Sequence, residues 1–328
     1  MRWQTIDINP LTRIFDICYA FDMCYALDMP FQASGICIIS SRKAISNLLL
    51  SKYIELSYSE AYRHKLKEIV MQIYTLFSGS SGNCVYVKDK NTEILIDAGK
   101  SAGAIEKSLT ALGSSLSNID GIFLTHEHTD HTVGLEIISK KYHIPVHITE
   151  VSYPKCIPPR SFVATCAKRH DTRYEAEIGS LKIHSFEIPH DSMQNVGYII
   201  ENDEGEKFGL ATDMGHITEK ILSSLVGCSY AVIESNHDIG MLKNGPYPYF
   251  LKQRILSDRG HLCNEECSKL ALYLASNGTK SITLAHLSRE NNTPDKAFEI
   301  TRNALNENGF YSVELNVASP IISVCVHK

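Results

Sequence analysis

Histidines and acidic residues are concentrated in one short stretch of the chain, Thr125-His126-Glu127-His128-Thr129-Asp130-His131. Imidazole nitrogens and carboxylate oxygens are common ligands of zinc, manganese and iron, and so dense a set has little other structural use. In extended backbone alternate residues share a face, so His126 and His128 can offer two imidazoles to one ion, while Asp130 and His131 point toward a second. The spacing predicts a site for two metal ions. For any single histidine, a hydrogen-bonded side chain in a polar loop is the simpler alternative.

The flanking residues indicate how the fold presents this stretch. Ile122-Phe123-Leu124 has the apolar character of a buried strand, and from Thr132 to Tyr142 the apolar spacing becomes helical. A loop between a strand and a helix is where α/β folds place chemistry, and a carboxylate such as Asp130 is favourable at a helix start. We therefore expect the loop to lie at one edge of a sheet.

Two ions need more ligands than one loop provides, and polar residues at the ends of other apolar runs can supply them. His190 follows the run 183–189, Asp213 follows 208–212, and His286 follows 282–285. Asp97 follows the run 94–96. An aspartate after a strand is usually a turn residue or a helix cap, so each is a weak signal alone. Together with the 125–131 loop they form a set.

The order and spacing of these residues resemble the five motifs of the metallo-β-lactamase superfamily, from about Met71 to the C-terminus. The resemblance implies an α/β fold, a four-layered αβ/βα sandwich with a dinuclear site in the cleft between its sheets. It also implies a hydroxide between two divalent ions, zinc or manganese, as the nucleophile. The implied ligands are His126, His128 and His190 for one ion, Asp130, His131 and His286 for the other, and Asp213 as the bridge, with Asp97 in support.

Other short motifs resemble the YycJ/WalJ branch of this superfamily, which groups with phosphodiesterases such as RNase Z and is associated with DNA exonuclease activity. They are FSGSSGN (77–83), ESNHD (234–238), GPYP (245–248), GHL (260–262) and AHLSRENN (285–292). One departure is Cys263, where we expect serine, and it puts a hydroxyl contact there in doubt. The resemblance implies a DNA exonuclease, acting 5′ to 3′ on a nucleic acid substrate.

Three residues outside the metal set, together with Asp130, are candidate catalytic residues. His237 stands where RNase Z-like enzymes carry a histidine that protonates the leaving group; the alternative is a loop-stabilising hydrogen bond. His261 resembles a phosphate-contacting histidine of the same relatives. Arg289 could fork onto a terminal phosphate, which an exonuclease recognises at a strand end, or form a surface salt bridge instead.

Supporting roles are expected for polar residues near these motifs. Ser80 and Asn83 lie in a Gly-Ser-rich turn that should overhang the cleft, although such turns need no function to explain them. Asn236 and Ser288 adjoin the candidates His237 and Arg289. Two tyrosines between prolines, Tyr247 and Tyr249, could stack on a base or simply pack.

The chain divides near residue 70. Residues 1–70 contain a near-duplicated hexamer, CYAFDM followed by CYALDM, and no periodicity connects them to the remainder of the chain. They are either an accessory segment or upstream sequence in front of the true start, with 44–69 helix-prone in both cases.

From 71 to 328 we expect one catalytic domain. Its predicted strands are 73–77, 84–88, 93–97, 121–124, 146–148, 181–188, 196–202, 207–212, 230–233, 281–285 and 321–326, and its helices 101–112, 132–142, 218–225, 265–277 and 294–308.

Composition limits the class and compartment of the protein. The net charge of −5 is not favourable for binding phosphates, although two divalent ions would make the cleft locally positive. No window has the apolar length of a membrane span, and the N-terminus lacks the pattern of a secretion signal. The ten cysteines show no disulfide framework, and Cys325 is expected to be buried. We expect a cytoplasmic protein.

Other functions use the same ligands. An RNase Z-like ribonuclease or a cyclic phosphodiesterase is the nearest alternative, and a thioester or β-lactam hydrolase is more distant. A metal-stabilised scaffold without activity is disfavoured because all seven expected ligands are present.

Overall fold

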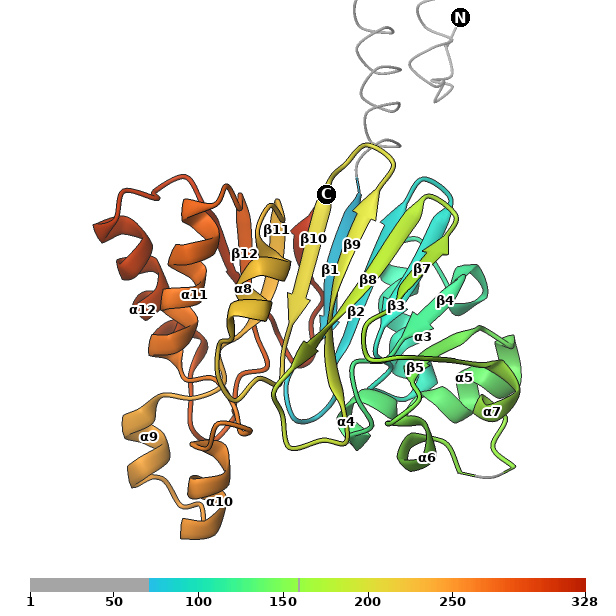
Figure 1. Ribbon diagram of the computed structural model, residues 1–328, viewed down its shortest axis with the longest axis horizontal. Helices are drawn as coiled ribbons and strands as arrows, with labels where there is room; N and C mark the ends of the chain where they lie inside the picture. Colours follow the sequence, from blue (N-terminus) through green and yellow to red (C-terminus); the bar gives the residue numbers. More distant parts are fainter. Residues whose placement is uncertain (1–70, 159) are drawn as a thin grey trace, which may run out of the picture. The chain divides into compact units, whose positions relative to one another are not determined.

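The computed structural model describes residues 71–158 and 160–328. Two seven-stranded sheets lie face to face (Figure 1). The first sheet, in spatial order, contains β14 (Val324–His327), β1 (Gln72–Phe77), β2 (Cys84–Asp89), β3 (Thr92–Ile96), β4 (Gly121–Phe123), β5 (Val146–Thr149) and β6 (Ala167–His170). The second contains β13 (Glu314–Val317), β12 (Ser281–Ala285), β11 (Tyr230–Glu234), β10 (Lys207–Ala211), β9 (Asn195–Asn202), β8 (Leu181–Ile188) and β7 (Glu175–Ile178).

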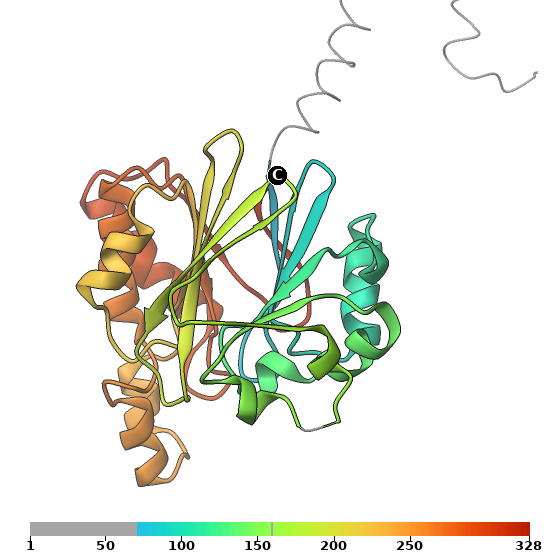
Figure 2. The same cartoon turned by 45° about the vertical axis from the view of Figure 1, so that its right-hand side comes forward.

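Helices cover the outer face of each sheet, which gives four layers (Figure 2). On the first sheet they are α3 (Ala102–Ala111), the 3₁₀ turn η1 (Leu116–Asn118), α5 (Leu135–Tyr142), α6 (Tyr153–Cys156) and α7 (Val163–Cys166), whereas α4 (Thr129–Thr132) lies at the edge where the strands end. On the second they are α8 (Glu219–Leu225), α11 (Asn264–Ser276) and α12 (Pro294–Glu307), with α9 (Ile239–Asn244) and α10 (Tyr249–Ile255) projecting below them in Figure 1. The predicted αβ/βα sandwich is confirmed.

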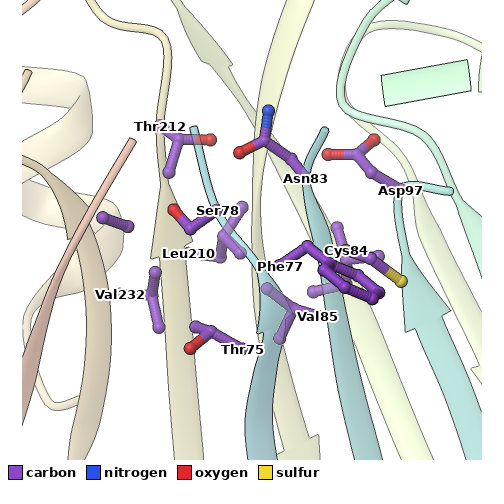
Figure 3. Close-up of a pocket in the computed structure, with 12 residues that line it drawn as sticks. Thr75, Phe77, Ser78, Asn83, Cys84, Val85, Asp97, Leu210, Thr212 and Val232 are labelled. Carbon is purple, nitrogen blue, oxygen red and sulfur yellow. The ribbon is translucent and has the colours of Figure 1, made fainter. Parts of the chain in front are cut away.

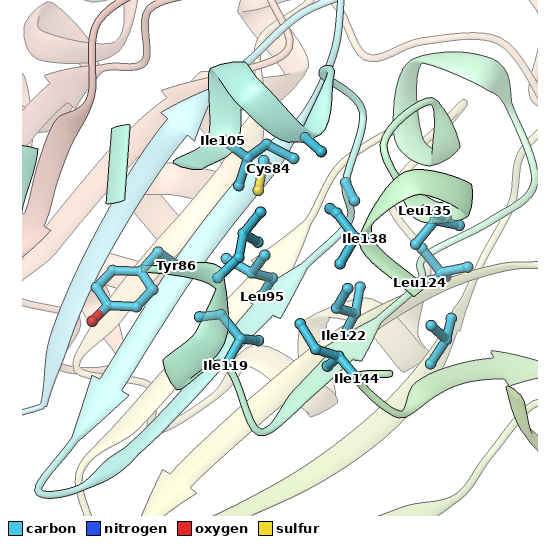
Figure 4. Close-up of a cluster of buried hydrophobic side chains, with 14 of the residues drawn as sticks. Cys84, Tyr86, Leu95, Ile105, Ile119, Ile122, Leu124, Leu135, Ile138 and Ile144 are labelled. Atoms are coloured by element: carbon cyan, nitrogen blue, oxygen red, sulfur yellow. The ribbon is translucent and has the colours of Figure 1, made fainter. Parts of the chain in front are cut away.

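Three apolar cores hold the layers together. Side chains from α3 and α5, such as Ile105 and Ile138, pack against Leu95 and Ile122 on the outer face of the first sheet (Figure 4). A second core joins α8, α11 and α12 to the other sheet. The third lies between the sheets, where the rings of Phe123 and Tyr198 pack edge to face with their centroids 5.8 Å apart. Both faces of the central strands are therefore buried, which explains their nearly continuous apolar sequences.

Strand direction brings the predicted chemistry to one edge. Strands β3 to β6 run parallel, and so do β10 to β13. Because parallel strands end at the same edge of a sheet, the residues after β3, β4, β10, β11 and β12 gather there. The link between the two halves is direct, since the Val196 amide of β9 donates to the Thr125 carbonyl at 3.1 Å.

Several predicted boundaries were wrong. The predicted helix 132–142 is two helices, α4 and α5, because Gly134 makes a close backbone crossing there. Its amide donates to the Ala98 carbonyl at 2.8 Å, and a Cβ at this position would lie 2.5 Å from the Lys100 carbonyl oxygen. The chain bends so that the Asp130 loop can lie against the 97–100 segment.

The end of the chain also differs from prediction. The last strand is 324–327 rather than 321–326, and Ile321 and Ile322 are 71% and 66% exposed. Cys325 is exposed, not buried, because it lies on an edge strand of the first sheet. The elements η1, α6, α7, β6, β7, β13, α9 and α10 were not predicted, since they are short and lack a continuous apolar pattern. The helix expectation for 44–69 lies outside the described residues.

Candidate active site

The loop after β4 places His126 and His128 beside His190, which follows β8. The donor atoms of these three side chains lie within 4.8 Å of one another. The His126 Nε2 and His128 Nδ1 atoms are 2.9 Å apart, and the buried Nε2 of His190 has no hydrogen-bond partner among the described residues. Three ring nitrogens that face one point have the geometry of one metal position.

A second group forms from Asp130, His131 and His286. The Nε2 atoms of both histidines lie 3.6 Å from Asp130 Oδ2. Asp213 lies between the two groups, with Oδ2 3.4 Å from His131 Nε2 and Oδ1 3.9 Å from His190 Nε2. The structure thus brings together all seven predicted ligands, in the two sets that the resemblance implied, with Asp213 next to both.

Each of the five predicted ligand histidines has one ring nitrogen that faces away from the cluster. In four of them this nitrogen has a hydrogen-bond partner. Asp97 Oδ2 lies 2.8 Å from His131 Nδ1, and the Gly260 carbonyl accepts from His190 Nδ1 at 3.1 Å. Thr125 Oγ1 lies 3.0 Å from His126 Nδ1. Glu234 Oε1 accepts from His286 Nδ1 at 2.9 Å. Such partners fix the ring orientation and the tautomer, and they raise the basicity of the nitrogen that binds metal.

Backbone conformation aims three of these residues into the cleft. Asp97, Asp213 and His286 follow β3, β10 and β12, and their φ angles are +62°, +57° and +56°. Left-handed backbone costs on the order of 1–3 kcal/mol in a non-glycine residue and is concentrated at functional sites. Three strand ends share this strained turn, and the side chain of each lies in or beside the donor cluster.

The charge states of the cluster suit a cation. Burial lowers the pKa of His126, and the neighbouring histidines lower it further, so this imidazole is neutral. Burial by itself would raise the pKa of Asp130, but the His286 hydrogen bond and the charge of His131 lower it. Burial would lower the pKa of His131, yet Asp97 and the nearby carboxylates raise it to about 9. A divalent ion would displace that proton, because metal binding and protonation compete for the same nitrogen.

The predicted ligands therefore fit a pair of divalent ions. The unpartnered buried atoms His190 Nε2, Asp213 Oδ2 and His286 Nε2 all belong to this cluster. Nitrogen-rich sites with carboxylates accept zinc, manganese or iron. The donor set, together with these unsatisfied atoms, is the observation that supports a metal site.

Comparison with known proteins agrees with this geometry. Residues 92–286 match the family model described as beta-lactamase superfamily domain. The chain belongs to the metallo-β-lactamase superfamily. It is 34% identical to exodeoxyribonuclease YycJ of Bacillus anthracis over 72% of this chain and 89% of that one. It is 32% identical to exodeoxyribonuclease WalJ of Streptococcus pneumoniae over 71% and 87% of the two chains. The predicted family is confirmed, and the names of these relatives agree with the predicted phosphodiesterase.

Solved metallo-β-lactamase structures share the fold. The YhfI protein of Bacillus subtilis aligns with a TM-score of 0.55 at 13% identity, covering 78% of this chain and 99% of that one. The short form of human tRNase Z aligns with a TM-score of 0.51 at 14% identity, covering 78% and 100%. At this identity the likeness concerns the sandwich alone.

Glu234 is a site residue of this metallo-β-lactamase sandwich that was not predicted from the sequence. Its Oε1 accepts from His261 Nδ1 at 2.8 Å as well as from His286, and its Oε2 accepts the amides of Met214 and Leu262. The Glu234 side chain is fully buried. It forms a third donor cluster with Asp213, His261 and His286. A glutamate directly after the strand run 230–233 was the available signal, of the same kind that selected Asp213.

The two candidate catalytic histidines outside the ligand set lie in different environments. The His261 side chain is 20% exposed, contacts Glu234 and lies 3.9 Å from Asp213 Oδ1. His237 is 1% exposed, and neither of its ring nitrogens has a hydrogen-bond partner among the described residues. Burial lowers the pKa of His237 to about 4, so its ring is neutral at pH 7. Of the two, His261 combines access to solvent with a carboxylate that orients it.

The supporting candidates surround the cluster. Asn83 Nδ2 lies 3.1 Å from His131 Nε2 and 3.3 Å from Asp130 Oδ2, while Ser80 is exposed at the turn. Asn236 Nδ2 donates to the His286 carbonyl, and Ser288 Oγ accepts from the Asn291 amide, so both hold the loops. Beneath Asn83 and Asp97 is a small cavity between the sheets (Figure 3).

An open groove of about 480 Å³ extends from the first metal position. Its walls include His128, Lys155, Met193 and Arg259. The Arg259 guanidinium donates to the carbonyls of His190 and Ser192, at 2.8 and 3.2 Å. The groove has the volume of a small-ligand site and leads directly to His128.

The two tyrosines near the prolines differ in exposure. Tyr249 is 77% exposed on α10, whereas Tyr247 is half-buried.

Proposed function

We propose that the protein is a metal-dependent phosphodiesterase that degrades DNA from a 5′ end. Its two metals would be zinc or manganese, held by His126, His128 and His190 and by Asp130, His131 and His286, with Asp213 shared. The observation that supports the proposal is the His261–Glu234 pair, in which a buried carboxylate orients an imidazole beside a two-ion donor set. The exodeoxyribonuclease relatives, at 32–34% identity over most of their length, support DNA as the substrate.

The chain's own residues supply positioning and proton transfer. Two divalent ions, when bound, would lower the pKa of a water toward neutrality and offset the charge of a phosphodiester. Glu234 holds His261 with Nδ1 toward the carboxylate, which leaves Nε2 to protonate the departing oxygen of the substrate. The Asp213 carboxylate lies next to both donor groups and would be shared by the two ions. Asp97 fixes the ring of His131.

The test is a substrate panel with the purified, metal-loaded protein. Duplex DNA, single-stranded DNA and RNA are labelled at the 5′ or the 3′ end, and bis(p-nitrophenyl) phosphate and a chromogenic ester are assayed beside them. We expect mononucleotides from DNA, with the 5′ label released first. Activity confined to RNA or a small cyclic diester would replace the proposal with the ribonuclease or cyclic phosphodiesterase alternative. Hydrolysis of the ester alone would favour a thioester or β-lactam substrate.

The compartment is part of the proposal. Among the described residues, no helix is both long enough and apolar enough to cross a membrane. The seven cysteines of the described chain are all free thiols, which is typical of a reducing environment. The free thiols, with a nucleic acid substrate, support a cytoplasmic location.

A further inference from the structure

Two basic side chains converge on one hydroxyl group beside the metal cluster. Lys100 Nζ donates to Ser81 Oγ at 3.0 Å, and Arg289 Nη2 donates to the same oxygen at 3.1 Å. Across residues 71–158 and 160–328, neither cation forms an ion pair with a carboxylate. What sets the pair apart is that both cations donate to the same neutral oxygen.

The two basic side chains are close enough for their charges to interact. Burial lowers the pKa of Lys100, and the charge of Arg289 lowers it further, because the two cations repel each other. The Phe77 ring, with its centroid 5.8 Å from Lys100 Nζ, is a weak partner for this charge. An anion between the two cations would relieve the repulsion, and the Ser81 hydroxyl could donate to it.

The turn that carries Ser81 is fixed against both sides of the metal cluster. The Asn83 amide donates to the Asp130 carbonyl at 2.8 Å, and Ser78 Oγ accepts the His286 amide at 2.7 Å. Gly82 has a φ of +139°, and a Cβ there would lie 2.2 Å from the Gly99 carbonyl oxygen. The position of Ser81 relative to Asp130 and His286 is thus set by backbone contacts.

We propose that Lys100, Arg289 and Ser81 form a second phosphate site, which binds a phosphate of the substrate other than the one being cleaved. The proposal rests on the proposed phosphodiesterase function. A guanidinium and an ammonium that flank a hydroxyl match the oxygens of a phosphate, with arginine able to contact two of them. The sequence suggested Arg289 alone for this role, and the structure adds Lys100 and Ser81. The bound group is either a terminal 5′ phosphate or an internal phosphate of the strand.

The test compares Lys100→Gln and Arg289→Gln with the wild type on paired substrates. Single-stranded DNA carries a 5′ phosphate or a 5′ hydroxyl, and bis(p-nitrophenyl) phosphate has no second phosphate. We expect each substitution to reduce kcat/KM on DNA by about 10- to 100-fold, the size of one charged hydrogen bond. The loss on DNA should exceed the loss on the small diester at least about tenfold, and the salt dependence of DNA binding should fall by about one counterion. The matched control is Lys182→Gln, which removes an exposed lysine of β8 and should change neither substrate.

The substrate pair identifies the source of the phosphate. If the site binds a terminal phosphate, the wild type prefers the 5′-phosphorylated strand and both variants lose that preference. If it binds an internal phosphate, the variants lose activity equally on both strands, and a methylphosphonate at the neighbouring position reproduces the loss in the wild type. Equal losses on DNA and on the small diester, or no loss on either, would overturn the site. Failure of the wild type itself on DNA, with the small diester still hydrolysed, would refute the proposed function instead.

Discussion

At the scale of single residues, the orientation of the predicted ligands depends on the groups that form hydrogen bonds with them. Asp97, Gly260 and Glu234 hold the rings of His131, His190 and His286, so the remaining nitrogens face the cleft. The Asp213 carboxylate lies near both donor groups. It also carries left-handed backbone, at φ +57°.

The first prediction concerns Asp213→Asn. Asparagine tolerates the left-handed backbone and keeps the side-chain shape, so the fold should remain, but the charge shared by the two donor groups is lost. We expect turnover on DNA to fall by at least about 10²-fold, with reduced metal content. Kinetics and metal analysis of the purified variant measure this, with the exposed Asp203→Asn as the control. If the variant binds two ions and keeps full turnover, Asp213 is not a metal ligand.

The second prediction separates His261 from His237. If His261 protonates the leaving oxygen, His261→Ala should slow DNA cleavage by about 10²- to 10⁴-fold. It should slow bis(p-nitrophenyl) phosphate hydrolysis far less, because nitrophenolate leaves without a proton. His237→Ala should show no such selectivity, because burial keeps the pKa of His237 at about 4. The cleavage rates of the two variants on both substrates, measured at equal metal content, distinguish the two histidines. If His237→Ala, and not His261→Ala, loses activity on DNA alone, then His237 is the proton donor that the sequence resemblance implied.

At the scale of elements, the loops after β8 and α10 are held to each other. The Arg259 guanidinium bridges the His190 and Ser192 carbonyls, and the Gly260 carbonyl accepts from His190 Nδ1. The His216 ring adds a contact to the Asp258 carbonyl at 2.8 Å. One predicted metal ligand, His190, is thus positioned by a loop 70 residues further along the chain.

The third prediction tests this clamp with Arg259→Lys. Lysine keeps the charge but lacks the planar fork that spans two carbonyls. We expect metal affinity to fall by about 10-fold or more, the usual effect of losing a partner that orients a ligand. Competition with a chelator measures the affinity. Arg173→Lys, at a position between β6 and β7, serves as the comparison. Equal affinities in the two variants would show that His190 needs no such support.

At the scale of the molecule, the candidate metal site draws its residues from both halves of the sandwich. His126, His128, Asp130 and His131 belong to the first sheet's loops, whereas His190, Asp213 and His286 belong to the second's. Ions that bind only the folded chain stabilise it by mass action, by about 4 kcal/mol per site at a thousandfold excess over Kd.

The fourth prediction is that removal of both ions lowers the unfolding temperature of the protein by about 16–32 °C, given about 4 kcal/mol for each of two sites and about 2–4 °C per kcal/mol for a domain of this size. A chain limited to residues 71–328 should show the same shift, because all seven predicted ligands lie within it. Calorimetry with and without chelator measures both, with re-addition of metal to show reversibility. His184→Gln, which removes a histidine of β8 that pairs with Glu175 away from the site, should keep the full shift. No shift in either chain would mean that the ions do not hold the halves together.

Part of the candidate site could be predicted from the dense 125–131 stretch, and part from polar residues that stand at the ends of locally apolar runs. Asp97, Asp213 and His286 were found in this way, and strand direction then brought them to one edge. Glu234 gave the same signal, but its role became visible only next to His261. Short elements such as β6 and β7 were missed, since they have few buried side chains and their pairing is decided by neighbouring strands.

The sequence by itself determined the ligand types, the strand ends that carry them and therefore the family of the fold, because these depend on residues within a few positions of one another. Only the tertiary structure decided which distant groups share a partner. Glu234 meets His261 across 27 positions, and Arg289 meets Ser81 across 208. The physical reason is that such contacts are set by how strands pair and loops pack, and no local pattern of residue types records that geometry.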